Sequence, residues 1–232
     1  MESPPCGRVP RSFPEALNAL MVAEAQLSVA LQDGERMRAD NESLRQALGS
    51  ASRRAAAAQR AAHHDWLTGL PNRLFLIRRM QKAIATASQR RLQLALLFID
   101  LDGFKDVNDV LGHAVGDRLL ATVAARIAAC VRSDDIACRY GGDEFVALLT
   151  NLNDASIAVD VSQKIRKHIA ERYTIDGNQI RITASIGLAV YPDDGDRYDA
   201  LLGRADAAMF RDKAARGGGS AACNSRVACA RP

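Results

Sequence analysis

The stretch with the clearest chemical potential is residues 139–145, which read RYGGDEF. Gly141 and Gly142 can adopt positive φ angles without steric cost, so the backbone can turn sharply there and approach a ligand closely. Asp143 and Glu144 would then lie on the turn of a hairpin, where carboxylates can bind a metal ion or a phosphate-bearing molecule. The alternative is a hairpin with a solvated tip, and these residues alone leave both interpretations open.

A second group of charged residues follows an apolar run. Residues 92–99 are almost continuously apolar, as expected of a central strand covered on both faces. Asp100 and Asp102 come next, with Lys105 shortly after them. If this strand lies beside the hairpin, Asp100 and Asp143 meet at one edge of the sheet, where oxygen ligands suit Mg²⁺ and leave room for phosphates. In the alternative interpretation, Asp102 caps a helix and its neighbours are solvated.

The elements that must position these side chains alternate between helix and strand. Apolar spacing predicts helices over residues 74–88, 116–131, 153–172 and 198–215, and strands over residues 92–99, on both sides of Gly141 and Gly142, and over 179–191. Asn72 could cap the first helix, and Asp65 with Arg73 could tie the segment before it. This order predicts an α+β domain over residues 63–216, with a ferredoxin-like or palm-type, largely antiparallel central sheet and helices packed on it.

Residues 15–62 have the pattern of a coiled coil. Apolar residues recur mostly at spacings of three, four and seven, at Leu17, Leu20, Leu27, Leu31, Met37, Leu44 and Leu48. A helix that is polar except for one narrow stripe needs a partner, so we expect a homodimer formed through this helix. Gly34 keeps open a single amphipathic helix packed on its own domain, since glycine costs about 1 kcal/mol relative to alanine inside a helix.

The remaining segments lack such periodicity. We predict a disordered leader over residues 1–14 and a flexible tail, without a strand, over residues 217–232. His63 and His64 resemble metal ligands at first sight. We interpret them as hinge residues, because neighbours in sequence seldom point at one ion.

Composition excludes several classes of function. Lys and Arg exceed Asp and Glu by only 31 to 27, and a net charge of +4 is too small to indicate nucleic-acid binding. The five cysteines have no C-x-x-C spacing, so neither a disulfide framework nor a zinc site is predicted. No window approaches the roughly 20 apolar residues of a membrane span, and the start lacks the apolar core of a signal peptide. We therefore expect a cytoplasmic protein with no membrane segment in this chain.

Four separated motifs occur in a fixed order along the chain. They read DWLTGLPNR at residues 65–73, DLDGFK at 100–105, GHAVGD at 112–117 and RYGGDEF at 139–145. Any one of them is unspecific, but the ordered set resembles the GGDEF family of diguanylate cyclases. The resemblance covers residues 65–213. It implies a bacterial enzyme that joins two GTP molecules into cyclic di-GMP.

The resemblance assigns catalytic and metal-binding roles position by position. It implies that Asp100, the carbonyl of Leu101 and Asp143 hold Mg²⁺, with Mn²⁺ as an alternative. Glu144 is expected beside them as a second acidic group that helps to deprotonate the attacking ribose 3′-hydroxyl.

The resemblance also implies a set of substrate-binding residues, namely Gly141, Gly142, Lys105, Lys213, Asn108 and Asp117. The glycines allow the backbone to approach the nucleotide, and the lysines meet phosphate oxygens. Asn108 and Asp117 are expected to read guanine, because a carboxylate can accept from its N1–H and exocyclic amine while an amide serves its acceptor atoms.

Regulation and assembly follow from the same resemblance. One such domain is half of an active site, so two copies must face each other, and the coiled coil would set that encounter. Arg132 and Asp135 match an R-x-x-D motif that binds cyclic di-GMP and inhibits the enzyme; the alternative is an ordinary ion pair at a helix end. The family continues after its lysine as K-x-x-G-R-N, whereas Arg216 is shifted by one place here, which weakens the case for a phosphate contact.

Two other functions stay open. The chain could be a non-catalytic cyclic di-GMP receptor or scaffold that uses Arg132 and Asp135, or an enzyme that acts on another nucleotide. The intact residues 141–145 favour catalysis, since a receptor has no need of them. Asn108 and Asp117 favour a guanine nucleotide.

Overall fold

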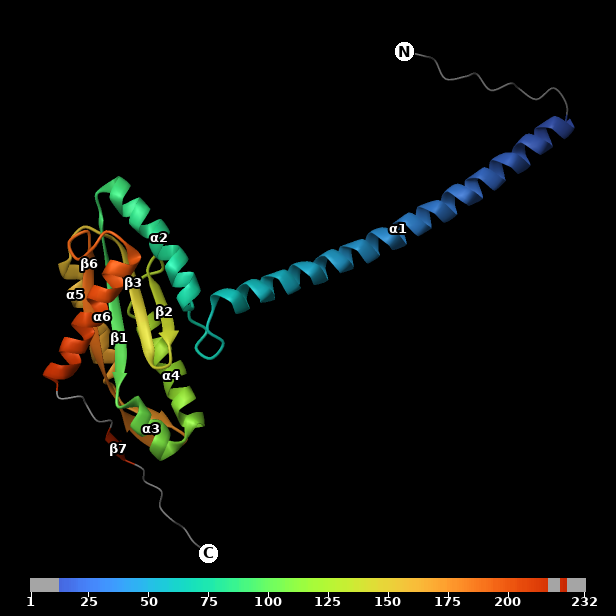
Figure 1. The fold of residues 1–232 in the computed structure, drawn as a ribbon. Coiled ribbons are helices and arrows are strands. Elements are labelled where there is room, and N and C mark those ends of the chain that lie inside the picture. Colours follow the sequence, from blue (N-terminus) through green and yellow to red (C-terminus); the bar gives the residue numbers. More distant parts are fainter. Residues whose placement is uncertain (1–12, 217–221, 225–232) are drawn as a thin grey trace, which may run out of the picture. The chain divides into compact units, whose positions relative to one another are not determined.

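A computed structural model describes residues 13–216 and the strand at residues 222–224 (Figure 1). The chain divides into two compact units, residues 1–58 and residues 59–232. The predicted leader lies outside the described residues, except that the first helix already begins at Phe13.

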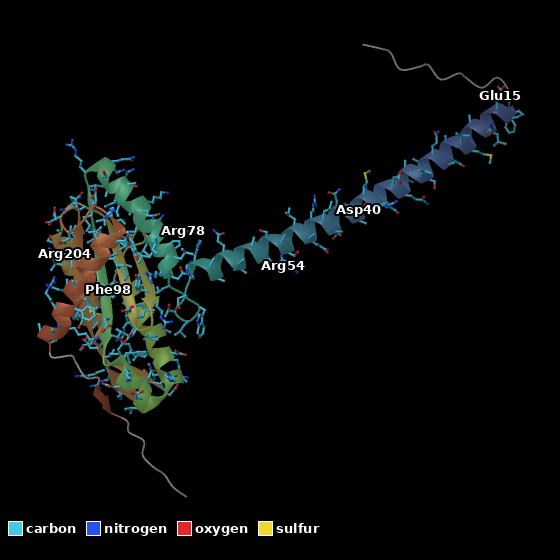
Figure 2. All side chains as sticks on the ribbon, viewed as in Figure 1. Glu15, Asp40, Arg54, Arg78, Phe98 and Arg204 are labelled. Carbon is cyan, nitrogen blue, oxygen red and sulfur yellow. The ribbon has the colours of Figure 1, made fainter. Side chains whose placement is uncertain are left out.

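The helix predicted over residues 15–62 is present as α1 (Phe13–His63), and it passes through Gly34 without a break. No residue of α1 is buried, and its side chains stand out along its length in Figure 2. The apolar stripe is exposed, from 50% of Leu17 to 72% of Leu48. No helix among the described residues has the length and apolar character needed to cross a membrane. Pairing of α1 with a second chain stays a prediction.

The central sheet has the strand order β2-β3-β1-β6, and every neighbouring pair is antiparallel. Its strands are β1 (Gln93–Asp102), β2 (Ile136–Gly141), β3 (Glu144–Leu152) and β6 (Thr183–Tyr191). The apolar run predicted this buried central strand, but β1 continues past residue 99 to Asp102. It does so because its ladder with β6 extends to the pair of Asp102 and Thr183.

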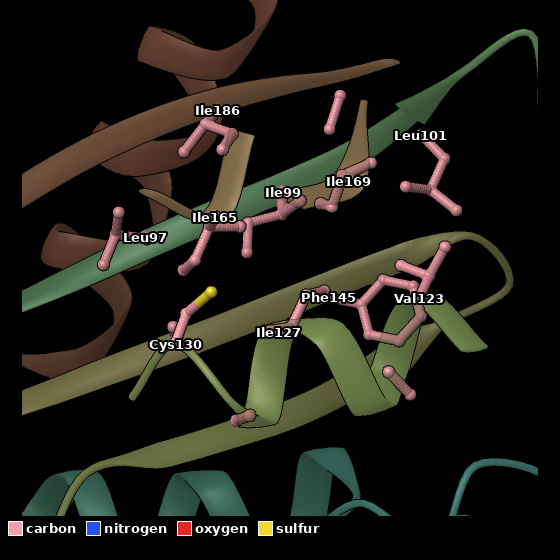
Figure 3. Packing of buried hydrophobic residues seen from close by; sticks show 14 of the residues in the cluster. Leu97, Ile99, Leu101, Val123, Ile127, Cys130, Phe145, Ile165, Ile169 and Ile186 are labelled. Carbon is pink, nitrogen blue, oxygen red and sulfur yellow. The ribbon is translucent and has the colours of Figure 1, made fainter. Parts of the chain in front are cut away.

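Helices cover both faces of this sheet, because successive side chains of β1 point to opposite faces. Leu97, Ile99 and Leu101 pack in the cluster of Figure 3 with α4 (His113–Ala128) and α5 (Ser156–Ile169). Leu96 and Phe98 pack on the opposite face with α2 (Arg73–Arg90) and α6 (Tyr198–Ala215). A short helix that the spacing did not predict, α3 (Phe104–Leu111), joins β1 to α4. The predicted α+β fold is confirmed.

A small second sheet contains β4 (Tyr173–Ile175), β5 (Asn178–Arg181) and β7 (Ala222–Asn224). The single strand predicted over residues 179–191 is therefore wrong, since it divides at Ile182 into β5 and β6. Burial keeps alternating across Ile182, so a period of two could not reveal the change of sheet. The prediction of a tail without a strand is wrong for residues 222–224, which pair with the open edge of β5.

A compact turn connects α1 to α2. Asn72 caps α2 as predicted, since its Oδ1 accepts a hydrogen bond at 3.0 Å from a backbone N–H in the first turn. His64 Nδ1 lies 3.0 Å from the carbonyl oxygen of Gly69, and His63 Nε2 lies 3.1 Å from Arg78 Nη1. Both imidazoles thus contact the turn or the start of α2.

Candidate active site

The acidic hairpin lies beside the end of β1, as the sequence predicted. Asp100 is paired with Glu144 across the ladder of β1 and β3. Gly142 and Asp143 form the turn between β2 and β3, and Gly142 adopts a φ of 51°, which glycine takes without strain. The pairing of β1 with β3 therefore gathers Asp100, Asp143 and Glu144 at one edge of the sheet.

These carboxylates are close enough to influence one another's protonation. Burial and the negative charge of Asp100 raise the pKa of Asp143 above its ordinary value. Burial also raises the pKa of Glu144, and the charges of Asp100, Asp143 and Asp206 act in the same direction. Such a concentration of negative charge favours a bound cation.

The donor set fits one kind of cation. Among the described residues, no group of three or more His, Cys, Asp or Glu side chains converges as a complete metal site. Mg²⁺ commonly takes one or two carboxylates and completes its shell with water and substrate phosphates. Asp100 and Asp143 with the carbonyl of Leu101 offer oxygen ligands only. This set fits Mg²⁺ bound together with a nucleotide.

Lys213 reaches the same acidic edge from the last turn of α6. Its Nζ donates to Asp100 Oδ1 at 2.5 Å, and this hydrogen bond raises the pKa of Lys213. The preceding residue anchors the helix, since Asp212 Oδ2 accepts from Ile186 N at 3.0 Å and from Arg166 Nη2 at 2.9 Å. The structure thus places the expected phosphate ligand Lys213 on an expected metal ligand, Asp100.

Asp102 is buried, with 2% of its surface exposed, and is not a helix cap. Its Oδ2 accepts a hydrogen bond from Thr183 Oγ1 and its Oδ1 one from Ser185 Oγ, both at 2.7 Å. Gly103 takes the cap position of α3 instead. This cluster was not predicted from the sequence, although Thr183 and Ser185, two hydroxyl residues at a spacing of two on an apolar strand, were an available signal.

Three predicted ligand residues lie on the two helices after β1. Lys105 and Asn108 belong to α3, and Asp117 belongs to α4. Lys105 and Asp117 are exposed, while Asn108 is half-buried against Gly116. The helices meet at Gly112, whose N–H donates to the carbonyl oxygen of Asn108 at 2.9 Å. Asn108 and Asp117 therefore lie on adjoining helices.

Arg132 and Asp135 form a turn before β2. Asp135 Oδ2 accepts from the backbone N–H of Arg132 at 3.1 Å, and its Oδ1 accepts from Thr150 N at 2.9 Å. The Arg132 side chain is exposed, and within the described part of the chain no ion pair joins it to Asp135. A cavity of about 220 Å³ opens beside this turn, with Arg79 and Lys82 in its lining. Because Asp135 accepts from backbone N–H groups and not from the Arg132 guanidinium, the two residues do not form the ordinary ion pair that the sequence left open.

Asp65 binds Arg139, so the predicted tie between Asp65 and Arg73 is wrong. Arg139 Nη1 lies 3.1 and 3.2 Å from the two carboxylate oxygens of Asp65. Burial alone would raise the pKa of Asp65, but hydrogen bonds from Thr68 and Arg139 outweigh it and hold the pKa below its ordinary value. Arg73 instead stacks on Tyr140, with its guanidinium carbon 4.6 Å from the ring centroid.

The comparison with protein families agrees with this geometry. A family model described as "Diguanylate cyclase, GGDEF domain" matches residues 62–218, which is more than half of the chain. The chain belongs to the GGDEF family. The family predicted from the ordered motifs is therefore confirmed.

Two curated relatives of this GGDEF domain come from Pseudomonas aeruginosa. The bifunctional diguanylate cyclase/cyclic di-GMP phosphodiesterase MucR is 48% identical over 152 residues, which are 66% of this chain and 22% of MucR. The diguanylate cyclase TpbB is 44% identical over 150 residues, which are 64% of this chain and 34% of TpbB. The chain thus spans about a fifth to a third of these relatives.

Solved structures of GGDEF domains resemble this one. A structure of TpbB that comprises only the GGDEF domain is 42% identical and covers 66% of this chain and 90% of its own, with a TM-score of 0.65. The coiled coil and GGDEF domain of DgcB from Caulobacter crescentus, in complex with cyclic di-GMP, is 27% identical. It covers 84% of this chain and 95% of its own, with a TM-score of 0.64.

This GGDEF domain departs from the family pattern at its last helix. Arg216 Nε donates to Asp212 Oδ1 at 3.1 Å, four residues earlier in the chain. The Arg216 guanidinium is thus held by α6 itself, in agreement with the expectation that the shift by one place weakens its case as a phosphate ligand.

Proposed function

We propose that this GGDEF domain is a diguanylate cyclase, which condenses two GTP molecules into cyclic di-GMP and releases two pyrophosphates. The observation that carries the proposal is the convergence of Asp100, Asp143 and Glu144 with Lys213 at one edge of the sheet. Acidic groups beside an ammonium group suit phosphoryl transfer, in which positioning and charge stabilisation supply most of the catalysis.

In each condensation, the ribose 3′-oxygen of one GTP forms a bond to the α-phosphorus of the other. The bond from that phosphorus to the oxygen bridging to the β-phosphate breaks, and pyrophosphate leaves with the electron pair. Glu144 is proposed to take the proton of the 3′-hydroxyl, since a raised pKa brings a carboxylate closer to the range of a useful base.

Mg²⁺, or Mn²⁺ in its place, would be held by Asp100, Asp143 and the carbonyl of Leu101. When bound, it supplies Lewis-acid stabilisation of the phosphate charge. Lys105 and Lys213 are proposed to bind phosphate oxygens. Gly141 and Gly142 leave the backbone of the turn open, since a Cβ at either would meet nothing within 4 Å. The backbone of the hairpin can therefore approach the nucleotide.

Asn108 and Asp117 are proposed to read the guanine base. Asp117 is an exposed carboxylate that can accept from N1–H and the exocyclic amine, and Asn108 offers an amide to the acceptor atoms. Adenine would not satisfy this pair. Because GTP is the proposed substrate, we place the reaction in the cytoplasm.

The proposed enzyme is active as a homodimer, because one domain binds one GTP and both new bonds need a second, facing copy. The exposed apolar stripe of α1 supports this assembly, since a parallel or antiparallel partner helix would bury it. The relative DgcB was solved as a coiled coil with its GGDEF domain, which favours the same role for α1.

Arg132 and Asp135 are proposed to bind the product, cyclic di-GMP, and to slow the enzyme. The Arg132 side chain is exposed, and a guanidinium binds phosphate and guanine through paired hydrogen bonds. The complex of DgcB with cyclic di-GMP supports product binding in this family.

The decisive experiment is incubation of the purified chain with GTP and Mg²⁺, followed by separation of nucleotides. Cyclic di-GMP and pyrophosphate in a ratio of one to two are the expected products, and Asp143→Asn should abolish both. A folded, oligomeric sample that forms neither product would overturn the proposal. If that sample still binds cyclic di-GMP, the chain is a receptor or scaffold instead.

A further inference from the structure

Asn108 and Gly116 are in unusually close contact where α3 meets α4. Gly116 is buried in α4, and the amide of Asn108 covers the place that a side chain at residue 116 would occupy. A Cβ built on Gly116 would lie 1.9 Å from Asn108 Oδ1 and 3.0 Å from Asn108 Cγ. The present position of the Asn108 amide thus exists only because residue 116 has no side chain.

The surroundings of Gly116 differ from those of Gly187, a glycine that the packing of the fold requires. A Cβ on Gly187 would lie 1.9 Å from the carbonyl oxygen of Ala205 and 2.2 Å from Met209 N, which are backbone atoms of α6. Around Gly116 the closest atom is the end of a flexible side chain, and Phe104 Cζ comes next at 3.3 Å. An added methyl at Gly116 would therefore displace mainly the Asn108 amide, with a shift of only a few tenths of an ångström at the Phe104 ring.

The backbone of Gly116 also tolerates alanine. Its φ does not lie in the left-handed region, and its N–H donates to the carbonyl oxygen of Gly112 at 3.2 Å as the first turn of α4 requires. Alanine is a better helix former than glycine at such a position. Helix geometry therefore gives no reason for a glycine here.

We infer that Gly116 is a positioning residue for base recognition: it holds open the space in which the Asn108 amide can face guanine. The inference rests on the proposed function, in which Asn108 and Asp117 read the base. Asp117 directly follows Gly116 on α4, so this one glycine sets the separation between the two base-reading side chains.

The size of the displacement is large on the scale of a hydrogen bond. Relief of the clash moves Asn108 Oδ1 outward by about 1 Å, from 1.9 Å to at least the 3.0 Å below which real Cβ contacts do not occur. Hydrogen bonds between N–H and O span only about 2.7–3.2 Å, so the amide loses its partner on the base.

The test compares Gly116→Ala, Asn108→Ala and the double variant in the full chain. Binding is measured with the α,β-methylene analogue of GTP, which cannot release pyrophosphate, and turnover is measured with GTP. We expect Gly116→Ala to raise Kd and KM about tenfold, the loss of one hydrogen bond, with little change in kcat. The melting temperature should stay the same or rise. Gly203→Ala, in open space on α6, is the matched control and should leave Kd unchanged.

The double variant separates a positioning role from a structural one. If Gly116 acts through Asn108, the double variant binds no more weakly than Asn108→Ala alone. Additive losses, or a Gly116→Ala variant that binds like the unchanged chain while Asn108→Ala binds weakly, would overturn the inference and leave the proposed function standing. If Asn108→Ala itself binds the analogue normally, the proposed reading of guanine fails, and the inference fails with it.

Discussion

Arg139 holds Asp65 and Gly142 at the same time. Its Nη1 donates to both carboxylate oxygens of Asp65, while its Nε and Nη2 donate to the carbonyl oxygen of Gly142 at 3.0 and 2.8 Å. Asp65 follows α1 by two residues, and Gly142 precedes Asp143 in the acidic turn. One guanidinium therefore connects the segment after α1 to the turn that carries the proposed metal ligand.

Replacement of Asp65 by alanine should lower both stability and turnover. The two side chains are largely buried, with 13% of Arg139 and 18% of Asp65 exposed, so their charged hydrogen bonds stabilise the fold by about 2 kcal/mol. A loss of that size lowers the melting temperature by about 4–8 °C. We expect kcat to fall severalfold as well, because Arg139, which donates to the carbonyl oxygen of Gly142, is no longer held by Asp65. Asp160→Ala, on the exposed surface of α5, is the control. A normal kcat in Asp65→Ala would limit the contact to a stabilising role.

The same pair predicts how stability depends on pH. The pKa of Asp65 is held below its ordinary value in the folded chain, so the unfolded chain binds the proton more readily. The stabilisation is complete above pH 3.8, the ordinary pKa of an aspartate, and is lost as the pH falls through the lower pKa of the folded chain. The stability difference between the unchanged chain and Asp65→Asn should thus be constant near neutral pH and shrink below about pH 4. A denaturation series at several pH values measures it, and a difference that grows in acid would contradict it.

The sequence predicted the parts of the site that local patterns encode. A buried strand followed by Asp100, and a glycine turn followed by Asp143, were visible as runs of residue types, and a single antiparallel pairing brought them together. Contacts between distant residues were not visible in this way. Arg139 and Asp65 are 74 residues apart, and Asp102 and Ser185 are 83 apart, so each depends on which elements become neighbours.

The break between β5 and β6 was hidden for a different reason. Alternation of buried and exposed residues reports which face a side chain occupies and not which sheet its strand joins. Ile182 is buried in step with its neighbours on both sides, although the chain changes sheets there. Only the pairing partners distinguish the two strands.

The buried carboxylate of Asp102 should contribute to the stability of the fold, although Asp102 lies only two residues from the proposed metal ligand Asp100. Asp102→Ala leaves the hydroxyls of Thr183 and Ser185 without their acceptor and opens a small cavity, which together cost about 2–4 kcal/mol. Asp102→Asn keeps the shape and one acceptor oxygen, so we expect a smaller loss. Urea denaturation of both variants measures the difference, with the exposed Thr122→Val as control. Equal losses in the two variants would show that the hydrogen bonds are not what Asp102 contributes.

The apolar stripe of α1 should make activity depend on protein concentration. Leu27→Lys with Leu31→Lys introduces charges into the stripe, so we expect the dimer to dissociate and specific activity to fall on dilution. Gln26→Lys with Gln32→Lys adds the same two charges outside the stripe and is the matched control. Sedimentation velocity and turnover are measured on the same samples. If the specific activity of the double variant equals that of the unchanged chain at every dilution, α1 has no role in the mechanism.

Lys213 and a metal ion should compete for Asp100. The Lys213 ammonium donates to Asp100 Oδ1, which is one of the oxygen atoms proposed to hold the cation. Lys213→Met removes this competitor, so we expect Mn²⁺ to bind the nucleotide-free variant several times more tightly, as electron paramagnetic resonance can measure. GTP should bind the same variant more weakly, because a phosphate ligand is lost.

Lys105→Met is the control that separates the effect of Lys213→Met on metal binding from its effect on GTP binding. Lys105 is exposed on α3 and makes no ion pair with Asp100 among the described residues, so its removal should weaken GTP binding without changing Mn²⁺ affinity. Opposite changes in metal and nucleotide affinity in Lys213→Met, but not in Lys105→Met, would mean that Lys213 occupies the cation position until a nucleotide arrives with its own ion. Unchanged or weaker Mn²⁺ binding in Lys213→Met would show that its bond to Asp100 does not oppose the metal.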